Sequence, residues 1–393
     1  MKILVAAEHL GRAGGMERYL ETVLPALQAR GAELLVVARR LDATPSGITA
    51  EALAWSAEHE APDASARAGL ERISASFAPD AAIAVNVMDA GIVEALRAAP
   101  RLMYQLHDHR PLCPNGDRVF PRSRSNCTAP LGAACVLHAL TDGCAYGPRP
   151  RTLTLIAQRR RLRDAIAAAD TVVVNSAYVA DRAASCGIAG ERIVEIAPPL
   201  PDDAFAGSIA PAASPASVVF AGRLVPQKGL LTLIDAIARL PASRRPLLRA
   251  FGDGPQRAAA RERAERRGVA IELPGAVAAE DLRVAIDRAA LVAVPSVWAE
   301  PFGLVGIEAC ARGRPVVAFA AGGIEAWLRD GENGRAVTLE RGDEARSAAL
   351  SGALAELLGD EALRARLGAG ARALAERYRA APIVDALLRE LTP

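Results

Sequence analysis

Lysine is nearly absent from this chain of 393 residues, which has only Lys2 and Lys228, while the other 45 basic residues are arginines. Lysine and arginine together number 47 against 45 acidic residues, so the formal net charge is only +2. A chain without a strong positive field lacks the electrostatic signature of a dedicated nucleic-acid binder. We therefore expect no nucleic-acid partner.

Long apolar runs and a secretory leader are also missing. The chain is 51% hydrophobic, but no stretch approaches the roughly 18 to 20 unbroken apolar residues that span a bilayer. The first residues, MKILVAAEHL, reach Glu8 and His9 without the longer apolar region and small-residue cleavage site of a signal peptide. Six cysteines are too few for a disulfide scaffold in so long a chain. These absences predict a cytoplasmic protein.

The chain is long enough for two domains at roughly 100 to 200 residues each. Short β-rich runs alternate with Ala, Leu and Arg stretches of helical period, which is typical of βα units around a parallel sheet. The expected strands are residues 3–7, 34–38, 82–87, 102–106, 171–174 and 193–197 in the first half, and 217–224, 247–251, 270–273, 291–295 and 315–320 in the second.

The middle of the chain contains a proline-rich segment, PPLPDDAFAGSIAPAASP, which cannot form a long helix or a central strand. We expect an N-terminal domain over 1–200, a linker over 201–216, a C-terminal domain over 217–375 and a terminal helix over 376–393 that crosses back to the first domain. The fold class is α/β, with two Rossmann-like doubly wound domains facing a central cleft. In such sheets, ligands bind beyond the carboxyl ends of the strands.

The first strand is followed by the glycine-rich loop HLGRAGGM and a helix beginning near Glu17. Glycines let the backbone approach a ligand closely, and free N–H groups at a helix start attract anions. The spacing is not G-x-G-x-x-G, which argues against a simple dehydrogenase. Turn geometry alone is the competing explanation.

The first loop of the second domain reads FAGRLVPQKG and contains Arg223 and Lys228. A guanidinium fork and a compact ammonium that bracket a turn suit a diphosphate. A solvated basic loop is the alternative.

A third loop, VPSVWAEPFGLVGIEA, joins a strand to a helix that opens near Phe302 and Gly303. The first N–H groups of that helix form an anion-binding site. The carboxylates of Glu300 and Glu308 can accept hydrogen bonds from sugar hydroxyls. Taken alone, both glutamates could be ordinary helix charges.

Together these segments resemble the retaining glycosyltransferases of family 4, the group 1 glycosyl transferases with the GT-B fold. The resemblance runs along essentially the whole chain: GGMER at residues 14–18, GRLVPQKG at 222–229, and EPFGLVGIEA at 300–309, which matches the family's E-x7-E pattern. The combination in this order is specific. It implies transfer of a hexose from a nucleotide diphosphate sugar, a UDP or GDP sugar, to a glycan, a lipid-linked sugar or a small molecule.

The resemblance also implies roles for individual residues. Arg223 and Lys228 would hold the donor diphosphate and stabilise the leaving nucleotide, Glu300 would contact the transferred sugar, and Glu308 would contact the ribose. The sugar and phosphates of the donor would be bound with the help of the backbone amides of Gly15, Phe302, Gly303, Leu304 and Val305. Gly252 of the FGDGP run would lie near the base. No cofactor is required, and retention is expected from a same-face substitution assisted by the leaving phosphate.

His107 follows a strand of the first domain in YQLHDHRPLCP and matches a cleft histidine of the family. An imidazole near neutral pH can donate to a sugar hydroxyl or assist a proton transfer, and we expect Asp108 to orient it. A structural histidine that caps the strand end is the alternative.

Four cysteines, Cys113, Cys127, Cys135 and Cys144, share one polar segment with three of the five histidines, so we expect an insertion at about 107–150. The C-x2-C spacing of a zinc ribbon is absent. Three explanations remain open: a structural zinc site, one or two disulfides, or unlinked thiols. Cys186 and Cys310 are expected in the core.

Arginines continue from this segment through Arg151 to the run QRRRLRD at 158–164. One interpretation is peripheral contact with an anionic membrane or a lipid-linked diphosphate, and the other is a solvated helix. For the whole protein, the alternatives to a transferase are an epimerase or phosphorylase of the same fold, or a non-catalytic binder of nucleotide sugars or glycans.

Overall fold

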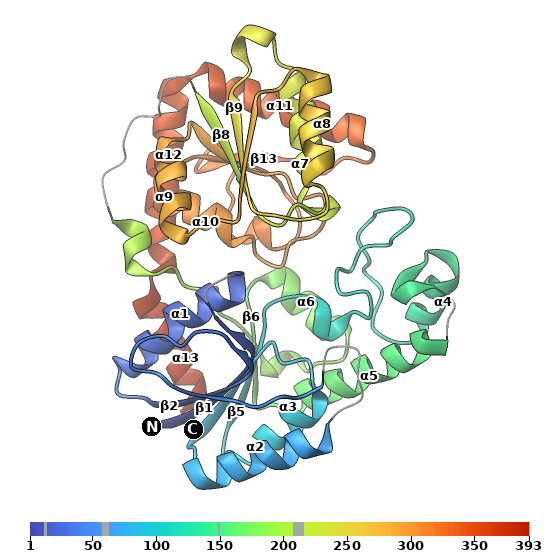
Figure 1. The fold of residues 1–393 in the computed structure, drawn as a ribbon, viewed down its shortest axis with the longest axis vertical. Coiled ribbons are helices and arrows are strands. Elements are labelled where there is room, and N and C mark those ends of the chain that lie inside the picture. The colour runs from blue at the N-terminus through green and yellow to red at the C-terminus, as the bar shows by residue number, and fades with distance from the viewer. Residues whose placement is uncertain (12–13, 57–62, 148–149, 207–215, 393) are drawn as a thin grey trace. The chain divides into compact units, whose positions relative to one another are not determined.

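The computed structural model describes residues 1–11, 14–56, 63–147, 150–206 and 216–392. The chain divides into two compact units: unit 1 contains Met1–Leu200 and the C-terminal segment from Ala380, and unit 2 contains Pro201–Arg379. Each unit has a parallel β-sheet with helices on both faces (Figure 1). The expected fold class of two doubly wound α/β domains is therefore confirmed.

The sheet of unit 1 has seven strands in the order β3-β2-β1-β4-β5-β6-β7, and every pair is parallel. The strands are β1 (Lys2–Leu10), β2 (Glu33–Leu41), β3 (Thr49–Ala52), β4 (Ala81–Val85), β5 (Leu102–Leu106), β6 (Thr171–Val174) and β7 (Ile193–Glu195).

Helices cover both faces of this sheet because its central strands are apolar on both sides. Along β1, Leu4 and Ala6 enter one core while Ile3, Val5 and Ala7 enter the other. The helices of unit 1 are α1 (Gly15–Gln28), α2 (Ala64–Phe77), α3 (Ala90–Leu96), α4 (Ala133–Thr141), α5 (Pro150–Ala167), α6 (Ala177–Ser185) and α13 (Ala380–Leu391), with short 3-10 turns η1 (Arg110–Leu112), η2 (Cys144–Tyr146) and η3 (Gly190–Arg192).

Unit 2 has a six-stranded parallel sheet in the order β10-β9-β8-β11-β12-β13. Its strands are β8 (Ser217–Ala221), β9 (Leu247–Phe251), β10 (Ile271–Gly275), β11 (Leu291–Val294), β12 (Val316–Phe319) and β13 (Gly334–Val337). Its helices are α7 (Leu230–Ala238), α8 (Arg257–Arg267), α9 (Ala279–Arg288), α10 (Leu304–Ala311), α11 (Asp343–Gly359) and α12 (Glu361–Ala375), with 3-10 turns η4 (Asp202–Phe205), η5 (Pro226–Lys228), η6 (Ala242–Arg244), η7 (Gly323–Ala326) and η8 (Glu376–Tyr378).

Every strand expected from the sequence is present, but the sequence missed β3 and β13. Both lie at an edge of their sheet. An edge strand is covered less completely, so its side chains need not be apolar: in β3, TAEA, none is buried. Without a hydrophobic run, neither strand has the signal that identifies a central one.

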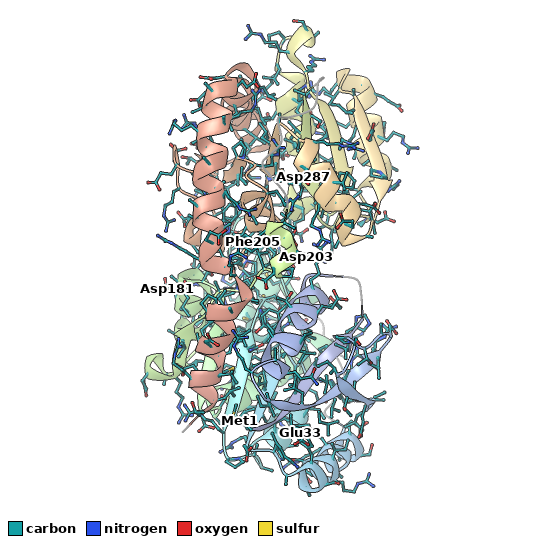
Figure 2. The ribbon with its side chains drawn as sticks, turned by 90° about the vertical axis from the view of Figure 1, so that its left-hand side faces the viewer. Met1, Glu33, Asp181, Asp203, Phe205 and Asp287 are labelled. Atoms are coloured by element: carbon teal, nitrogen blue, oxygen red, sulfur yellow. The ribbon has the colours of Figure 1, made fainter. Side chains whose placement is uncertain are left out.

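Part of the expected linker is a structured element of unit 2. The turn η4 buries Ala204 and Phe205, and the Arg379 guanidinium lies 4.1 Å from the centre of the Phe205 ring. Arg283 pairs with Asp203 at 3.0 Å, and Figure 2 shows Asp203 and Phe205 on this turn near Asp287. The rest of the expected linker, residues 207–215, lies outside the described residues.

The last helix, α13, belongs to unit 1. It contacts α1 (Figure 1), and Val384, Leu387 and Leu391 enter the same core as Ile3 of β1. Residues 376–378, expected at the start of this helix, form the separate turn η8 of unit 2.

Candidate active site

The centre of the unit 2 sheet is a topological switch point. The chain moves from β8 outward through β9 and β10 in one direction, and from β11 outward through β12 and β13 in the other. Ligands of doubly wound sheets bind beyond the strand ends at such a point. The loops after β8 and β11 contain Lys228 and Glu300, so both residues stand where a ligand is expected.

Lys228 and Glu300 form a direct ion pair at this switch point. The Lys228 Nζ donates to Glu300 Oε1 at 2.6 Å, and the Ser296 hydroxyl donates to the same carboxylate oxygen. The Glu300 side chain is only 5% exposed. Burial by itself would raise the Glu300 pKa, but the Lys228 ammonium and these hydrogen bonds outweigh burial and lower it. The site therefore holds an ionised carboxylate against a lysine.

Glycine brings the two loops together. Gly229, just after Lys228, has φ of 72°, and a Cβ built there would lie 1.9 Å from the Pro295 carbonyl oxygen. Only a residue without a side chain fits this approach. The loop after β8 is thus pressed against the end of β11, which places Lys228 beside Glu300.

The FGDGP loop after β9 approaches the β8 loop in the same way. A Cβ at Gly252 would lie 2.0 Å from the Gly222 carbonyl oxygen. The Leu224 amide donates to the Asp253 carbonyl at 2.8 Å. Gly252 is therefore required for the backbone packing of these loops.

Helix α10 begins at Leu304, after Gly303 with φ of 86°. The fully buried Trp327 sets its position: the indole N–H donates to the Phe302 carbonyl at 2.7 Å, and a Cβ at Gly306 would lie 2.1 Å from the ring. The first N–H groups of a helix lack intrahelical partners, so those of Leu304 and Val305 can receive an anion. Glu308 is half-buried further along the helix.

Arg223 differs from Lys228 in its surroundings. It is exposed, and within the described residues its guanidinium makes no hydrogen bond or ion pair. It can therefore turn toward an anionic ligand without breaking an existing contact.

Unit 1 has a cavity of about 340 Å³ at its own switch point, between β1 and β4. Its lining comes from β1, α1, β2 and the loops after β4 and β5. These residues are Ala7, Glu8, His9, Gly15, Met16, Glu17, Leu20, Arg39, Arg40, Val85, Asn86, Met88 and Arg110. The cavity has room for a monosaccharide and carries charges of both signs.

Glu8 and His9 organise this cavity from the end of β1. The Glu8 carboxylate accepts from Arg39 at 2.9 Å, from the Trp55 indole at 3.2 Å and from the Met88 amide at 2.7 Å. The His9 ring lies between two further carboxylates, those of Glu17 and Asp42. Arg40 is exposed and forms no ion pair within the part of the chain that the structure describes.

His9 lies between two carboxylates. Its Nδ1 is 2.7 Å from Glu17 Oε1, and its Nε2 is 2.6 Å from Asp42 Oδ2. The hydrogen bond with Asp42, together with Glu17, raises the His9 pKa against the effect of burial. The two acceptors favour an imidazolium that donates from both nitrogens.

His107 lies at the carboxyl end of β5 and is held on several sides. Its ring centre is 4.4 Å from that of Tyr19, and its Nε2 is 3.4 Å from Gln105 Oε1. Burial lowers the His107 pKa to about 4. The imidazole is neutral near pH 7.

Asp108 does not orient the His107 ring as we expected. Its carboxylate accepts from Arg110 and from the Asn86 amide group instead. Asn86 also accepts from the His107 amide at 3.2 Å, and its backbone has φ of 50°. This buried asparagine, missed by sequence reasoning, thus aligns the ends of β4 and β5. Its position directly after a buried strand was the available signal.

The cysteine segment holds thiols without bonds between them. All six cysteines are free, and among the described residues no three His, Cys, Asp or Glu side chains are placed to hold a metal ion. Burial raises the pKa of Cys144 to about 12, and the thiols of Cys113, Cys127 and Cys135 add to this effect. The Cys144 thiol therefore favours the protonated form.

Two histidines of this segment have partners other than the cysteines. His138 lies 3.0 Å from Asp142 and packs its ring against Phe120, while His109 is buried with its ring edge-on to Tyr178. The described cysteines of this segment are thus unlinked, whereas zinc binding stays a prediction. Cys186 and Cys310 are buried, as expected.

Two family descriptions match consecutive parts of the chain. Residues 13–203 match Glycosyltransferase Family 4, and residues 204–374 match Glycosyl transferases group 1. The chain belongs to the group 1 glycosyltransferases. The two matches meet near the boundary between units 1 and 2.

Curated relatives of this group 1 glycosyltransferase align with part of it. The lipopolysaccharide core biosynthesis glycosyltransferase LpsE of Rhizobium meliloti is 36% identical over 178 residues, which cover 44% of this chain and 49% of LpsE. The D-inositol 3-phosphate glycosyltransferase of Nocardia farcinica is 34% identical over 282 residues, 66% of this chain and 59% of that protein. The chain thus spans about half the length of the curated relatives it matches.

Solved structures of glycosyltransferases share the fold along the whole chain. WaaG, a glycosyltransferase involved in lipopolysaccharide biosynthesis, has a TM-score of 0.73 at 18% identity and covers 99% of both chains. Anabaena HepE in complex with UDP-glucose has a TM-score of 0.70 at 20% identity, with 99% of each chain covered. These similarities establish the GT-B fold of the group 1 glycosyltransferase.

Proposed function

We propose that this group 1 glycosyltransferase transfers a hexose from a UDP or GDP sugar, with retention of configuration, to a glycan, a lipid-linked sugar or a small molecule in polysaccharide or glycoconjugate synthesis. The observation that carries the proposal is the Lys228–Glu300 pair at the switch point of unit 2. The HepE structures with UDP and UDP-glucose support a uridine nucleotide as the first donor to try.

The donor diphosphate is assigned to groups with positive charge. The Lys228 ammonium, the Arg223 guanidinium and the first N–H groups of α10 are such groups, and charge develops on the diphosphate as the bond to the sugar breaks. A preorganised cation stabilises that charge without moving. Lys228 is held in place by Glu300, while Arg223 is free to close on the ligand.

The carboxylates are assigned to hydroxyl groups. Glu300 is ionised: one oxygen accepts from Lys228 and Ser296, and a hydrogen bond from Trp298 also lowers its pKa. We assign this carboxylate to accept a hydrogen bond from a sugar hydroxyl. Glu308 on α10 is assigned to the ribose, Gly252 to the region of the base, and the amides of Gly15, Phe302 and Gly303 to the donor. These assignments rest on the family resemblance.

The cavity of unit 1 is assigned to the acceptor. Its carboxylates and guanidinium groups offer acceptors and donors to a polyhydroxylated molecule. His107 is neutral because its pKa is about 4, so it can donate to a hydroxyl or accept a proton, but it brings no positive charge.

The two lysines of the chain provide a direct test of the donor site. Lys228 and Lys2 are labelled with an amine-reactive reagent, and peptide mass spectrometry gives the labelling rate of each. We expect a UDP or GDP sugar to slow labelling at Lys228 at least about tenfold and to leave Lys2 unchanged. Protection of neither lysine by any nucleotide sugar would contradict the proposed donor site.

Activity and stereochemistry test the remainder of the proposal. The protective donor is incubated with candidate acceptors, and the anomeric configuration of the product is read by NMR. A product that keeps the donor configuration supports retention, whereas inversion would overturn it. Protection of Lys228 without turnover on any acceptor would favour a non-catalytic binder, and isomerised donor would reveal an epimerase.

A further inference from the structure

Exposed aliphatic side chains are concentrated on one small part of unit 1. Of the seven large hydrophobic side chains that are exposed among the described residues, three lie on α4 and one on the first turns of α5. They are Val136 at 37%, Leu137 at 58%, Leu140 at 57% and Leu153 at 59% exposure. We call these four residues the α4/α5 patch.

The outward face of α4 is apolar because the helix uses its other face for packing. Ala139 is buried and Cys135 packs against the core of unit 1. The helical period then places Val136, Leu137 and Leu140 together on the outside. A surface helix ordinarily exposes its polar face, whereas α4 exposes aliphatic side chains.

Helix α5 begins beside α4. The two helices are in contact and lie together in Figure 1. The Thr152 hydroxyl donates to the Ala145 and Gly147 carbonyls just beyond α4. This anchor holds the start of α5, with Leu153, next to the chain that leaves α4.

The same region is strongly basic. Residues 107–167 contain ten arginines and four aspartates, a net charge of +6, while the whole chain has only +2. Arg122, Arg124, Arg151 and Arg160 are exposed, and none of the four forms an ion pair within the described residues. The region therefore combines apolar surface with uncompensated positive charge.

These two properties together select one kind of partner. Apolar side chains beside exposed arginines bind the interface of an anionic bilayer, where aliphatic groups enter the acyl boundary and guanidinium groups meet lipid phosphates. A second copy of this chain would place arginines against arginines. No helix within the described residues is long and apolar enough to cross a bilayer, so contact would be peripheral.

We propose that the α4/α5 patch and its arginines dock this protein onto anionic membrane surfaces. Docking places the cysteine-containing insertion at the bilayer. The inference concerns a surface separate from Lys228 and Glu300, and it stands whether or not the proposed donor chemistry is correct.

Vesicle sedimentation tests the proposal. The full chain is mixed with vesicles of phosphatidylcholine alone and with vesicles of equal parts phosphatidylcholine and phosphatidylglycerol. We expect binding to the anionic vesicles only, weakened by added salt. The double substitution Leu137→Gln and Leu140→Gln should reduce the partition coefficient at least about tenfold. Arg124→Gln with Arg151→Gln should reduce it about twenty-five-fold, at about fivefold for each charge.

Matched control variants separate docking from general surface effects. Val277→Gln with Val284→Gln removes two exposed aliphatic side chains of unit 2, at 36% and 40% exposure, and should leave vesicle binding unchanged. Thermal unfolding and Lys228 labelling confirm that each variant is folded.

Three outcomes would overturn the proposal. They are equal binding to neutral and anionic vesicles, no binding at all, or patch variants that bind like wild type. Sedimentation velocity without lipid tests whether the α4/α5 patch instead binds a second copy of this chain. A wild-type dimer that Leu137→Gln with Leu140→Gln dissociates, with no vesicle binding, would assign the patch to a second copy instead.

Discussion

The switch points of the two sheets differ in how their charged groups are held. In unit 2, Lys228 and Glu300 contact each other directly, the carboxylate is buried, and glycine fixes the loops that carry them. In unit 1, the charges are spread over β1, β2 and the loops after β4 and β5, around an open cavity. The first site is preorganised for one arrangement, whereas the second leaves exposed groups such as Arg40.

This difference matches what each site must recognise under the proposed function. The diphosphate has the same chemistry in every UDP or GDP sugar, so a rigid pair of loops serves it well. Acceptors differ in shape and charge, and a cavity lined by separate elements can change one side chain at a time. Four substitutions test this difference between the two sites.

The largest effect is expected from Lys228→Met. It leaves Glu300 buried without its cation, and breaking a buried pair in this way costs about 3–5 kcal/mol. We expect kcat/KM to fall at least about a hundredfold and the unfolding temperature to drop. Steady-state kinetics and thermal unfolding measure both. Lys2→Met is the matched control, because Lys2 is 43% exposed and 3.8 Å from Glu33. Equal effects of the two substitutions would refute the special role of Lys228.

Acid should reveal the ionised state of Glu300. Its pKa lies below the ordinary value of 4.5 in the folded chain, so its stabilising contribution is present above pH 4.5 and is lost as pH falls through the lowered pKa. Glu300→Gln should therefore cost about 1–3 kcal/mol near neutral pH, and the difference from wild type should shrink as pH falls below 4.5. Denaturant unfolding at several pH values measures it.

The exposed pair of Glu356 with Arg335 provides the control for this measurement. Glu356 also has a lowered pKa, but its side chain is 46% exposed. Glu356→Gln should cost less than about 1 kcal/mol. A cost for Glu300→Gln that stayed constant with pH would show that the carboxylate is not ionised.

A moderate and selective effect is expected from Arg40→Gln in the cavity of unit 1. The substitution removes an exposed cation that needs no internal partner, so folding should be unaffected. We expect the KM for an anionic acceptor to rise about fivefold to tenfold, with the donor KM unchanged. Arg244→Gln, an exposed arginine of unit 2, is the control. A change in the donor KM alone would contradict the assignment of Arg40 to the acceptor site.

The smallest effect is expected from His9→Asn. The raised His9 pKa means that its contribution is fully present below pH 6.5 and is lost as pH rises through the folded pKa. Because His9 is 29% exposed and Asp42 is 64% exposed, the cost should be at most about 1 kcal/mol at pH 6 and smaller in alkali. NMR titration of the ring gives the pKa directly, and a value below 6.5 would contradict the two-carboxylate arrangement.

The central elements of the fold were predictable, and the edges were not. β5, β6 and β9 begin and end at the predicted residues, because a strand covered on both faces is mostly apolar. β3 and β13 could be recognised only in the folded sheet, since their main role is to add backbone hydrogen bonds at an edge. The linker was also partly misassigned, because Phe205 is buried by arginines far along the chain.

The candidate site shows the same division. Arg223, Lys228, Gly303 and Glu300 were visible in short motifs, because loops that follow parallel strands meet at one end of the sheet. Ser296 and Trp327 carry no such motif, although they hold Glu300 and α10 in place. Their importance follows only from contacts between loops.

Periodicity and local motifs, which are properties of neighbouring residues, were enough to predict the two parallel sheets, the positions of their central strands and the loops that carry Lys228 and Glu300. Three features became visible only in the folded chain: Glu300 is buried against Lys228, Asp108 binds Arg110 rather than His107, and α4 turns its leucines outward. Burial and partner choice depend on residues that are distant in the chain, and packing alone brings them together.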